Sequence, residues 1–406
     1  MILFLHNRYR IPGGEERVVD DLLWLVREHL GEPAELLARD SHDTVRARAA
    51  AGLLRGGLRP DDVGEAVRRT GARVVHAHNL HPSFGWRALA AARAAGARVV
   101  LHLHQYRLVC AVGVCFTGGK ECVRCHGRNT LPGVLRNCRG ARAEALVYGS
   151  ALSLWQRRMV EHADAVVAPS DFARARLREL GASLPWERVH VLAPPVRALE
   201  DGVPARRGAP MPTPAGEAML DDQEADRCSS LDATASTPSE GYALMVGRLS
   251  PEKGVEVAIE ACRIAGVPLV VAGAGLDGDE QGIGDAGVRF LGRVDEARLA
   301  QLRADAALAL MPSRSAETFG LAAAEAMAAG LPVVGSRIGA LPELLEEQAL
   351  APPGDAPALA AAIARALADP AAGERARERV RTICAPERVA AALAEIYAAA
   401  EATRPA

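Results

Sequence analysis

Short apolar runs rich in Val, Leu and Ile alternate with longer helical patterns along most of this chain, and this alternation constrains the fold more than any other feature. Such runs, separated by crossover helices, are typical of strands in a parallel sheet. The first series consists of MILFLH (1–6), RVVHAHN (73–79), ARVVLHLH (97–104), DAVVAPS (164–170) and VHVLAPP (189–195). We therefore predict an α/β fold whose first doubly wound domain spans residues 1–198.

The alternation breaks at residues 199–240, where Pro, Ala, Ser, Asp and Glu dominate without an apolar period. Such a segment buries little surface, so we predict a disordered linker or insertion. The second series consists of YALMVGR (242–248), VPLVVAG (267–273), VRFLGRV (288–294), AALALMPS (306–313), LPVVGS (331–336) and ALAPPGD (349–355). It predicts a second α/β domain over 241–385, and 386–406 reads as a helix that could pack on the first domain. Two open sheets joined in this way leave a cleft for a ligand.

Charge and hydropathy argue against two classes of protein. The 406-residue chain has a formal net charge of −2, so no global positive field indicates a nucleic-acid partner. No apolar stretch approaches the ~18–20 residues of a membrane span, and no basic segment precedes the apolar start. We expect a cytoplasmic protein that could touch the inner face of the membrane as a peripheral protein.

The stretch ETFGLAAAE (317–325) carries a glutamate at each end of an otherwise small and apolar segment. It follows a strand-like run, so we predict a helix that begins near Gly320 or Leu321. Free N–H groups and the positive end of the helix dipole would suit a phosphate there. Helical rise would separate Glu317 and Glu325 by roughly 12 Å, which is too far for a shared acid/base pair but suits the two ends of a nucleotide sugar. Alternatively, both are ordinary helix residues.

The stretch VGRLSPEKG (246–254) carries two cations. Arg248 ends the first strand of the second domain, Ser250-Pro251 would open a helix, and Lys253 would lie in its first turn. A cation there opposes the helix dipole, and a bound polyanion would resolve the conflict. Arg248 can fork onto phosphate oxygens while Lys253 acts as a point charge. The alternative is two surface cations.

Together, GRLSPEKG and ETFGLAAAEAMAAGLPVVGSRIGALPELL resemble the retaining, GT-B-fold glycosyltransferases of family four, also called group 1. PGGEERVV, VHAHNL and LHLHQYRLVC support the same resemblance, which covers nearly the whole chain outside 199–240. It implies two Rossmann-like domains facing across a cleft. It also implies hexosyl-type transfer, with retention, from a UDP- or GDP-sugar to an unidentified acceptor in carbohydrate biosynthesis: a glycan, a lipid-linked saccharide or a small natural product.

The resemblance also implies roles for residues of the second domain. Arg248 and Lys253 would hold the donor diphosphate, Glu317 would contact the transferred sugar, and Glu325 would contact the ribose. The backbone amides that would meet sugar and phosphate are those of Phe319, Gly320 and Leu321. These cations and the helix N-terminus would replace a catalytic metal, so no cofactor is expected for the chemistry.

In the first domain, the glycine pair Gly13-Gly14 follows the first strand and would let the backbone approach the donor, although such a pair is often only a turn. His104 ends the run VVLHLH and corresponds to a histidine that lines the acceptor side in the family. A lone strand-end histidine is otherwise more often structural. His76, His78 and His102 are expected to matter less.

Two other functions stay open on the sequence alone. One is a GT-B sugar-nucleotide epimerase, for which no acid/base residues can be placed. The other is a nucleotide-sugar-binding partner subunit without turnover, against which the intact cations and glutamates argue. Turnover distinguishes all three.

Five of the eight cysteines crowd into residues 110–138, where a C-x2-C pair lies between two remote thiols. This is zinc-like spacing, and reduced thiols suit a closed, structural site. The predicted ligands are Cys110, Cys122, Cys125 and Cys138, with Cys115 and His126 as substitutes. Buried free cysteines or a disulfide are the alternatives.

Overall fold

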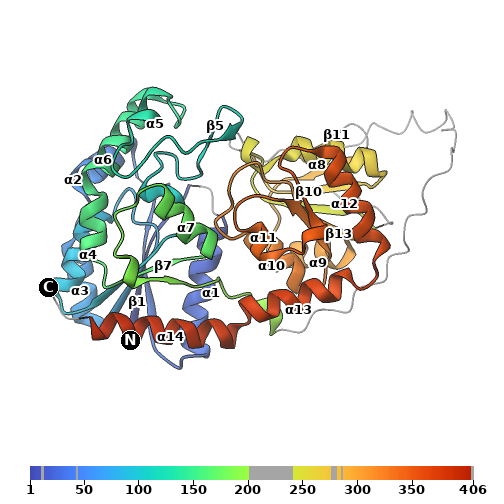
Figure 1. Ribbon diagram of the computed structural model, residues 1–406. Helices are drawn as coiled ribbons and strands as arrows, with labels where there is room; N and C mark the ends of the chain where they lie inside the picture. The colour runs from blue at the N-terminus through green and yellow to red at the C-terminus, as the bar shows by residue number, and fades with distance from the viewer. Residues whose placement is uncertain (11–12, 43, 201–240, 276–280, 285–286, 404–406) are drawn as a thin grey trace.

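Two α/β halves lie side by side, the first coloured blue to green and the second yellow to red in Figure 1. This computed structural model describes residues 1–10, 13–42, 44–200, 241–275, 281–284 and 287–403. Each half has a sheet between helices, and the carboxyl ends of its central strands face the other half. The predicted fold class is confirmed.

The first sheet has six parallel strands. Their order is β2 (Ala34–Asp40), β1 (Ile2–Arg8), β3 (Val74–Ala77), β4 (Arg98–His102), β7 (Ala165–Ala168) and β8 (Val189–Val191). Successive side chains of β1 point to opposite faces of the sheet and so enter two different cores. Leu3 and Leu5 pack with α3 (Asp61–Thr70) and α4 (Gly85–Ala94). Ile2 and Phe4 pack with α1 (Gly14–Glu28) and α14 (Pro386–Ala402). The strand order changes direction at β1 and β3, so the loops after these strands flank a crevice.

The second sheet has seven strands, six of them parallel. Their order is β11 (Gln281–Gly284), β12 (Val288–Leu291), β10 (Leu269–Ala272), β9 (Ala243–Val246), β13 (Leu308–Met311), β14 (Val333–Ser336) and β15 (Leu350–Ala351), with β11 antiparallel. The order changes direction at β9 and β13. The loops after these two strands carry GRLSPEKG and ETFG, which explains why two distant motifs meet.

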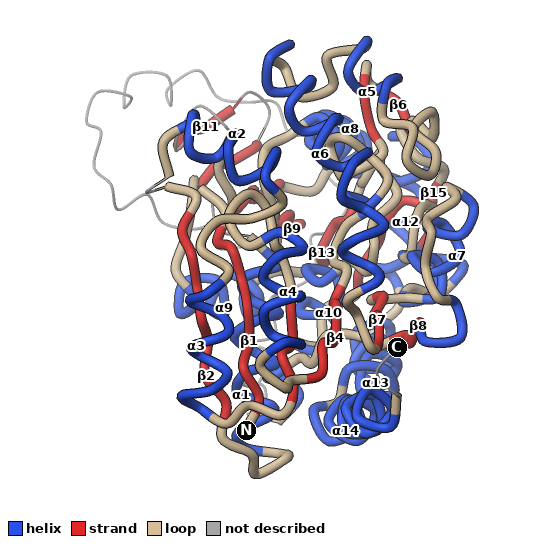
Figure 2. The backbone as a smooth tube through the Cα atoms, turned by 90° about the vertical axis from the view of Figure 1, so that its left-hand side faces the viewer, coloured by secondary structure: helices blue, strands red, loops and turns tan. Residues whose placement is uncertain are grey.

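Helices cover both sheets. The remaining ones are α2 (Arg46–Arg55), α5 (Leu131–Leu135), α6 (Arg142–Glu161), α7 (Asp171–Glu179), α8 (Val255–Ala265), α9 (Glu296–Asp305), α10 (Leu321–Ala328), α11 (Leu341–Leu344), α12 (Ala356–Ala368) and α13 (Ala372–Cys384). After α13 the chain returns to the first half, where α14 packs Leu393, Ile396 and Tyr397 into the core beside α1 (Figures 1 and 2).

Every predicted strand segment contains a strand, but the sequence pattern missed β2, β11 and the small hairpin of β5 (Phe116–Thr117) and β6 (Lys120–Glu121). The side chains of β2 are mostly half-buried because the strand lies at the sheet edge, so its apolar signal is weak. Of the predicted linker, Leu199 ends a 3-10 turn and Glu200 pairs with His29, while residues 201–240 lie outside the described residues.

Candidate active site

A cleft of about 510 Å³ opens between the two halves, a size typical of ligand pockets. Side chains from both sheets line it. All the predicted catalytic and donor-binding positions are among them: Gly13, Gly14, His104, Arg248, Lys253, Glu317, Phe319, Gly320, Leu321 and Glu325. The fold therefore brings the predicted residues together, whereas their roles stay predictions.

The N-terminus of α10 opens into the cleft at the predicted place. Gly320 caps the helix with φ +101°, a conformation that favours glycine, and a Cβ there would lie 2.9 Å from Leu341 Cδ2. One earlier expectation is wrong: Glu317 lies in the loop after β13 and not on the helix, so helical rise does not set its distance from Glu325. Gly339 makes this loop compact, because a Cβ there would lie 2.3 Å from the Glu317 nitrogen.

Glu317 holds Lys253 in the cleft. Lys253 Nζ and Ser313 Oγ each donate a hydrogen bond of 2.6 Å to Glu317 Oε1. Burial alone would raise the pKa of Glu317, but Lys253 and the serine hydroxyl outweigh it and hold the pKa below its usual value. The carboxylate is thus charged at neutral pH and fixed in position.

The expectation for Lys253 needs correction. Ser250-Pro251 opens a 3-10 turn (Pro251–Lys253), Gly254 follows with φ +70°, and α8 begins only at Val255. Lys253 therefore precedes α8, and Glu317 already compensates its charge, so the predicted conflict with the helix dipole does not arise. Arg248 Nη2 lies 3.4 Å from Glu252 Oε1, and the Arg248 side chain is 46% exposed beside the cleft.

Glu325 is held by two arginines. Arg303 donates to Oε2, and Arg17 Nε lies 3.2 Å from Oε1. Arg17 comes from the first turns of α1 and also forks onto Glu296, so these ion pairs cross between the halves. The sequence reasoning missed Arg17, although a cation near the start of a helix is the signal that it used for Lys253.

The glycine pair is fixed from both sides. Glu16 accepts hydrogen bonds from the Tyr9 and Gly13 amides, at 2.9 and 2.7 Å. A Cβ on Gly14 would lie 3.4 Å from Leu321 Cδ2, so this loop reaches the start of α10. A larger side chain at Gly14 would press on the helix end that faces the cleft.

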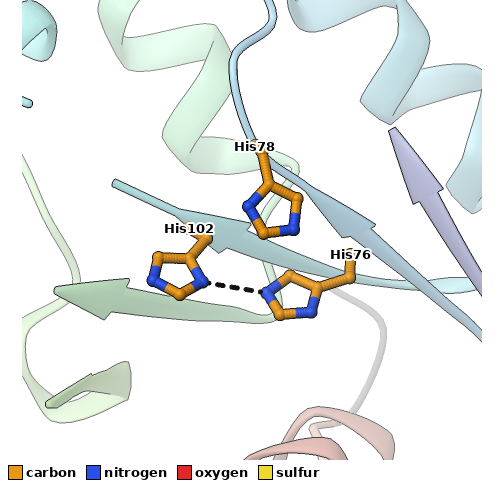
Figure 3. A group of neighbouring side chains, drawn as sticks. All are labelled: His76, His78 and His102. Atoms are coloured by element: carbon orange, nitrogen blue, oxygen red, sulfur yellow. Dashed lines mark hydrogen bonds between the residues drawn. The ribbon is translucent and has the colours of Figure 1, made fainter. Parts of the chain in front are cut away.

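Four histidines stack at the ends of β3 and β4, and Figure 3 shows three of them. They form two pairs: His76 Nε2 and His102 Nδ1 lie 3.2 Å apart, and His78 Nδ1 and His104 Nε2 lie 2.8 Å apart. The ring planes are inclined by 12° in the first pair and by 20° in the second. The rings of the first pair stack on those of the second.

The distances within the two pairs are those of N–H···N hydrogen bonds. His76, His78 and His102 offer nitrogens within 4.8 Å of one another. In the His76–His102 pair the two nitrogens lie within hydrogen-bond distance, 3.2 Å apart, in nearly parallel rings. His76, which the sequence reasoning set aside, also bonds Tyr397 OH at 2.9 Å.

The histidine network assigns the tautomer of His104. Burial lowers the pKa of His76 and of His104 to about 3 and that of His78 and His102 well below its usual value, so all four rings are neutral. His78 Nε2 is buried and has no partner among the described residues. A buried unpaired N–H is disfavoured more than an unpaired lone pair, so His78 carries its proton on Nδ1 and donates it to His104 Nε2. His104 then carries its proton on Nδ1.

A polar cluster that the sequence reasoning missed lies beside His104. Glu15 Oε2 accepts hydrogen bonds from Tyr9 OH at 2.8 Å and Gln105 Nε2 at 3.3 Å, and Arg107 donates to Tyr9 OH at 3.2 Å. Burial raises the pKa of Glu15. All four side chains line a small pocket that also contains His104. Hydroxyl, amide and charged groups in this pattern suit a hydroxylated ligand.

Comparison with known families settles the assignment. The family description "Glycosyl transferase 4-like domain" matches residues 15–195, and "Glycosyl transferases group 1" matches residues 240–369, together more than half of the chain. The chain belongs to the group 1 glycosyltransferases. The suspected family is thereby confirmed, and the cleft described above lies between its two matched regions.

Individual group 1 relatives match over shorter stretches. O-antigen chain mannosyltransferase B of Escherichia coli is 34% identical over 136 residues, 30% of this chain and 35% of that protein. A D-inositol 3-phosphate glycosyltransferase of Jonesia denitrificans is 30% identical over 204 residues, 46% of this chain and 44% of that protein. The matched stretches thus span less than half the length of these relatives.

Solved structures match along nearly the whole chain. Anabaena HepE in complex with UDP and glucose has a TM-score of 0.57 and 18% identity over 97% of this chain and 98% of its own. Sucrose-phosphate synthase from Thermosynechococcus elongatus has a TM-score of 0.63 and 20% identity over 98% of each chain. At this identity the likeness shows the shared GT-B fold.

The cysteine cluster of this group 1 glycosyltransferase lies outside the cleft. All cysteines of the described residues are free thiols, so no disulfide joins them, and the zinc site stays a prediction. The substitute ligand His126 packs against Gly181 and does not line the cysteine pocket. None of the helices in the described part of the chain combines the length and apolar character needed to cross a bilayer.

Proposed function

We propose that this chain is a retaining glycosyltransferase that moves a sugar from a nucleoside diphosphate donor, a UDP- or GDP-sugar, to a hydroxyl-bearing acceptor. The observation that carries this proposal is the convergence, in one cleft, of Arg248, Lys253 and the N-terminus of α10, flanked by Glu317 and Glu325. Cations and amide donors at the centre suit a diphosphate, and carboxylates at the sides suit hydroxyls. Solved neighbours crystallised with UDP or UDP-glucose support this class of donor.

The leaving diphosphate would be stabilised without a catalytic metal. Arg248 forks onto its oxygens, Lys253 lies between Glu317 and the phosphates, and the α10 amides face the developing charge. Because Ser313 and Lys253 already fix Glu317, its free lone pairs can accept hydrogen bonds from the sugar hydroxyls at little entropic cost. Glu325, anchored by Arg17 and Arg303, accepts from the ribose.

The acceptor would enter from the first half, beside His104 and the polar cluster of Tyr9, Glu15, Gln105 and Arg107. In the retaining reaction the bond from the sugar C1 to the diphosphate oxygen breaks, and the acceptor oxygen bonds C1 on the same face. The acceptor proton passes to the released phosphate oxygen. His104 Nδ1–H is suited to hold a sugar or acceptor oxygen but, being neutral and a donor, not to take that proton.

We also propose that the acceptor side contacts a membrane surface peripherally. On the neighbouring helices α5 and α6, Leu131, Leu135 and Leu146 are 57%, 76% and 57% exposed, and Arg136 and Arg142 are exposed near them. Exposed leucines with arginines suit an anionic bilayer. Flotation with anionic vesicles should recover the wild type, while Leu135→Asp should reduce recovery. Equal recovery of both would reject this contact.

The donor is tested by thermal shift with a panel of nucleoside diphosphates and their sugars. A ligand at 100 times its Kd stabilises the folded state by ~2.7 kcal/mol, so the preferred donor should raise the melting temperature measurably. Lys253→Ala should reduce this shift. Arg263→Ala, which removes a surface cation paired with Glu260 away from the cleft, should not. No shift with any nucleotide would reject the proposal. Once an acceptor is found, the anomeric coupling constant of the product tests retention.

A further inference from the structure

The wall of the cleft beside His104 is built from a segment with little regular structure. Between the 3-10 turn Tyr106–Leu108 and α6, residues 109–141 contain only the two-residue strands β5 and β6 and the five-residue α5. Val123, Leu131 and Leu135 are exposed, so the segment has few apolar side chains to bury. Yet Gly113 and Val114 line the cleft, and Gly119 O accepts a 2.7 Å hydrogen bond from Arg314 of the second half. A long irregular segment in such a position needs a cross-link.

Five cysteines of this segment surround one small pocket. The pocket is lined by Cys110, Cys115, Cys122, Cys125 and Cys138, and the exposed residues Arg124 and Arg136 also line it. A hydrogen bond from the Cys122 amide to the Cys115 carbonyl, at 2.7 Å, joins the C-x2-C turn to the stretch that begins at Cys110. Two cations beside the sulfurs would offset the double negative charge of a zinc tetrathiolate.

Backbone amides point at the sulfurs. The amides of Val112, Gly113 and Cys115 and the Cys115 thiol lie close to Cys110 Sγ. The amides of Ala111 and Gly133 lie close to Cys125 Sγ, and the Cys125 thiol donates a long hydrogen bond, at 4.0 Å, to the Thr130 carbonyl oxygen. Such donors favour thiolates and orient metal ligands.

The backbone at Cys115 is in an uncommon conformation. Its φ of +51° is rare for a residue other than glycine, and such backbone persists where surrounding contacts require it. Here it turns the Cys115 thiol toward Cys110 and leaves the carbonyl free for Cys122. Cys115 thereby lines the same pocket as Cys110.

We propose that Cys110, Cys122, Cys125 and Cys138 bind one Zn²⁺ as a closed structural site that fixes the acceptor-side wall of the cleft. Soft thiolates select zinc over hard cations, and each ligand thiol releases its proton to solvent on binding. No three cysteine sulfurs of the described residues lie within 4.8 Å of one another, whereas four sulfurs at ~2.3 Å from zinc would be about 3.8 Å apart. Rotation of the cysteine side chains into the pocket must therefore accompany binding.

The metal content of protein purified with a non-histidine tag, without chelators, tests the site. We expect about one zinc per chain by mass spectrometry. Cys122→Ser and Cys138→Ser should lose it. The matched controls Cys115→Ser, in the same pocket, and Cys262→Ser, buried in α8 of the second half, should keep it. Zinc-free wild-type protein, bound iron instead, or zinc retained in Cys122→Ser would overturn the proposal.

A second measurement covers ligand variants that fail to fold. Zinc in the wild type is exchanged for Co²⁺, and the absorption spectrum is recorded. Four thiolates should give intense sulfur-to-cobalt charge-transfer bands and the visible bands of tetrahedral cobalt, and titration with a mercurial should release one metal ion as four thiols react. A spectrum of octahedral cobalt, or metal release without thiol modification, would contradict the site. These readouts do not depend on transferase activity, so their failure leaves the proposed function intact.

Discussion

Lys253 and Glu317 form the ion pair at the centre of the proposed donor site, and each side chain compensates the charge of the other. Lys253 is largely buried, so its charge needs a partner when no phosphate is bound. Glu317 supplies that partner and is itself held by Ser313. The pair is therefore preorganised, and a diphosphate meets a cation already in position.

The two glutamates should have separable effects. Glu317→Gln removes the negative charge that faces the sugar but keeps a side-chain oxygen that can accept from Lys253 and Ser313. Turnover should therefore fall ~10–100-fold, as expected for a hydrogen bond to a charged group, while bare nucleoside diphosphate binds almost as before. Glu325→Ala removes the ribose contact and should weaken bare-nucleotide binding ~10-fold. Calorimetry with the nucleoside diphosphate, beside turnover of the donor, checks this. Glu260→Gln on the surface of α8 is the control. Equal losses of nucleotide affinity in both glutamate variants would contradict the assignment.

His78 should act as a positioning residue through His104. His78→Phe keeps the ring stacking and removes the Nδ1–H that fixes the His104 tautomer, so kcat/KM should fall ~5–10-fold, the cost of about one hydrogen bond. The melting temperature should not fall, because the variant also removes the unpaired His78 Nε2. Donor turnover and thermal melting measure the two effects. His190→Phe on β8 is the control. Parallel losses of stability and activity would indicate a purely structural role.

At the scale of elements, the strand order explains why the sequence alone could locate the site. Periodicity placed GRLSPEKG after β9 and ETFG after β13, and in an open parallel sheet these loops meet at the switch point. Local pattern could not place α8, which begins only after the left-handed Gly254. Nor could it find Arg17 beside Glu325, because that contact depends on how the two halves pack.

The histidine pairs that join β3 and β4 should make the first half acid-sensitive. His76 and His104 have a pKa of about 3 in the folded state, against ~6.5 when unfolded. The unfolded chain thus binds more protons between these values, so stability rises with pH and is lost as pH falls from about 6.5 toward 3. At pH 5 the contribution of each of these two rings to the free energy of unfolding should be about 2 kcal/mol smaller than at high pH.

Urea unfolding of the first half at pH 7 and pH 5 measures this loss. His76→Phe should show a smaller loss than the wild type, because one titrating ring is gone. The carboxylates titrate alike in both proteins, so their contribution to the pH dependence of stability cancels when the two proteins are compared. An identical pH dependence in the variant would contradict the lowered pKa of His76.

At the scale of the whole molecule, several contacts hold the two halves together around the cleft. Glu343 of the second half accepts hydrogen bonds from the Asp171 and Phe172 amides at the N-terminus of α7, at 3.2 and 2.5 Å. Thr318 donates to the His104 carbonyl at 2.9 Å. Thr318 and His104 line the cleft, so their bond holds the two halves close together at the proposed donor site, an arrangement that would exclude water.

Glu343→Ala should favour opening, because it removes the carboxylate that satisfies two amides of α7 and complements its helix dipole. We expect a larger radius of gyration in small-angle X-ray scattering and a higher KM for the donor. Glu346→Ala, which removes a surface glutamate paired with Arg375 within the second half, is the control. An unchanged scattering profile and KM in Glu343→Ala would show that the other contacts suffice.

Turnover of the donor chosen by thermal shift tests the central claim most directly. Wild-type protein is incubated with the nucleotide sugar and a panel of methyl and octyl hexosides as surrogate acceptors, and both nucleoside diphosphate release and glycoside formation are measured. The wild type should release nucleotide and form a glycoside, Arg263→Ala should match it, and Lys253→Ala should lose ~100-fold in kcat/KM, as expected for the loss of a charged contact to the diphosphate. Full activity in Lys253→Ala, or an isomerised donor without nucleotide release, would contradict a glycosyltransferase acting from this cleft.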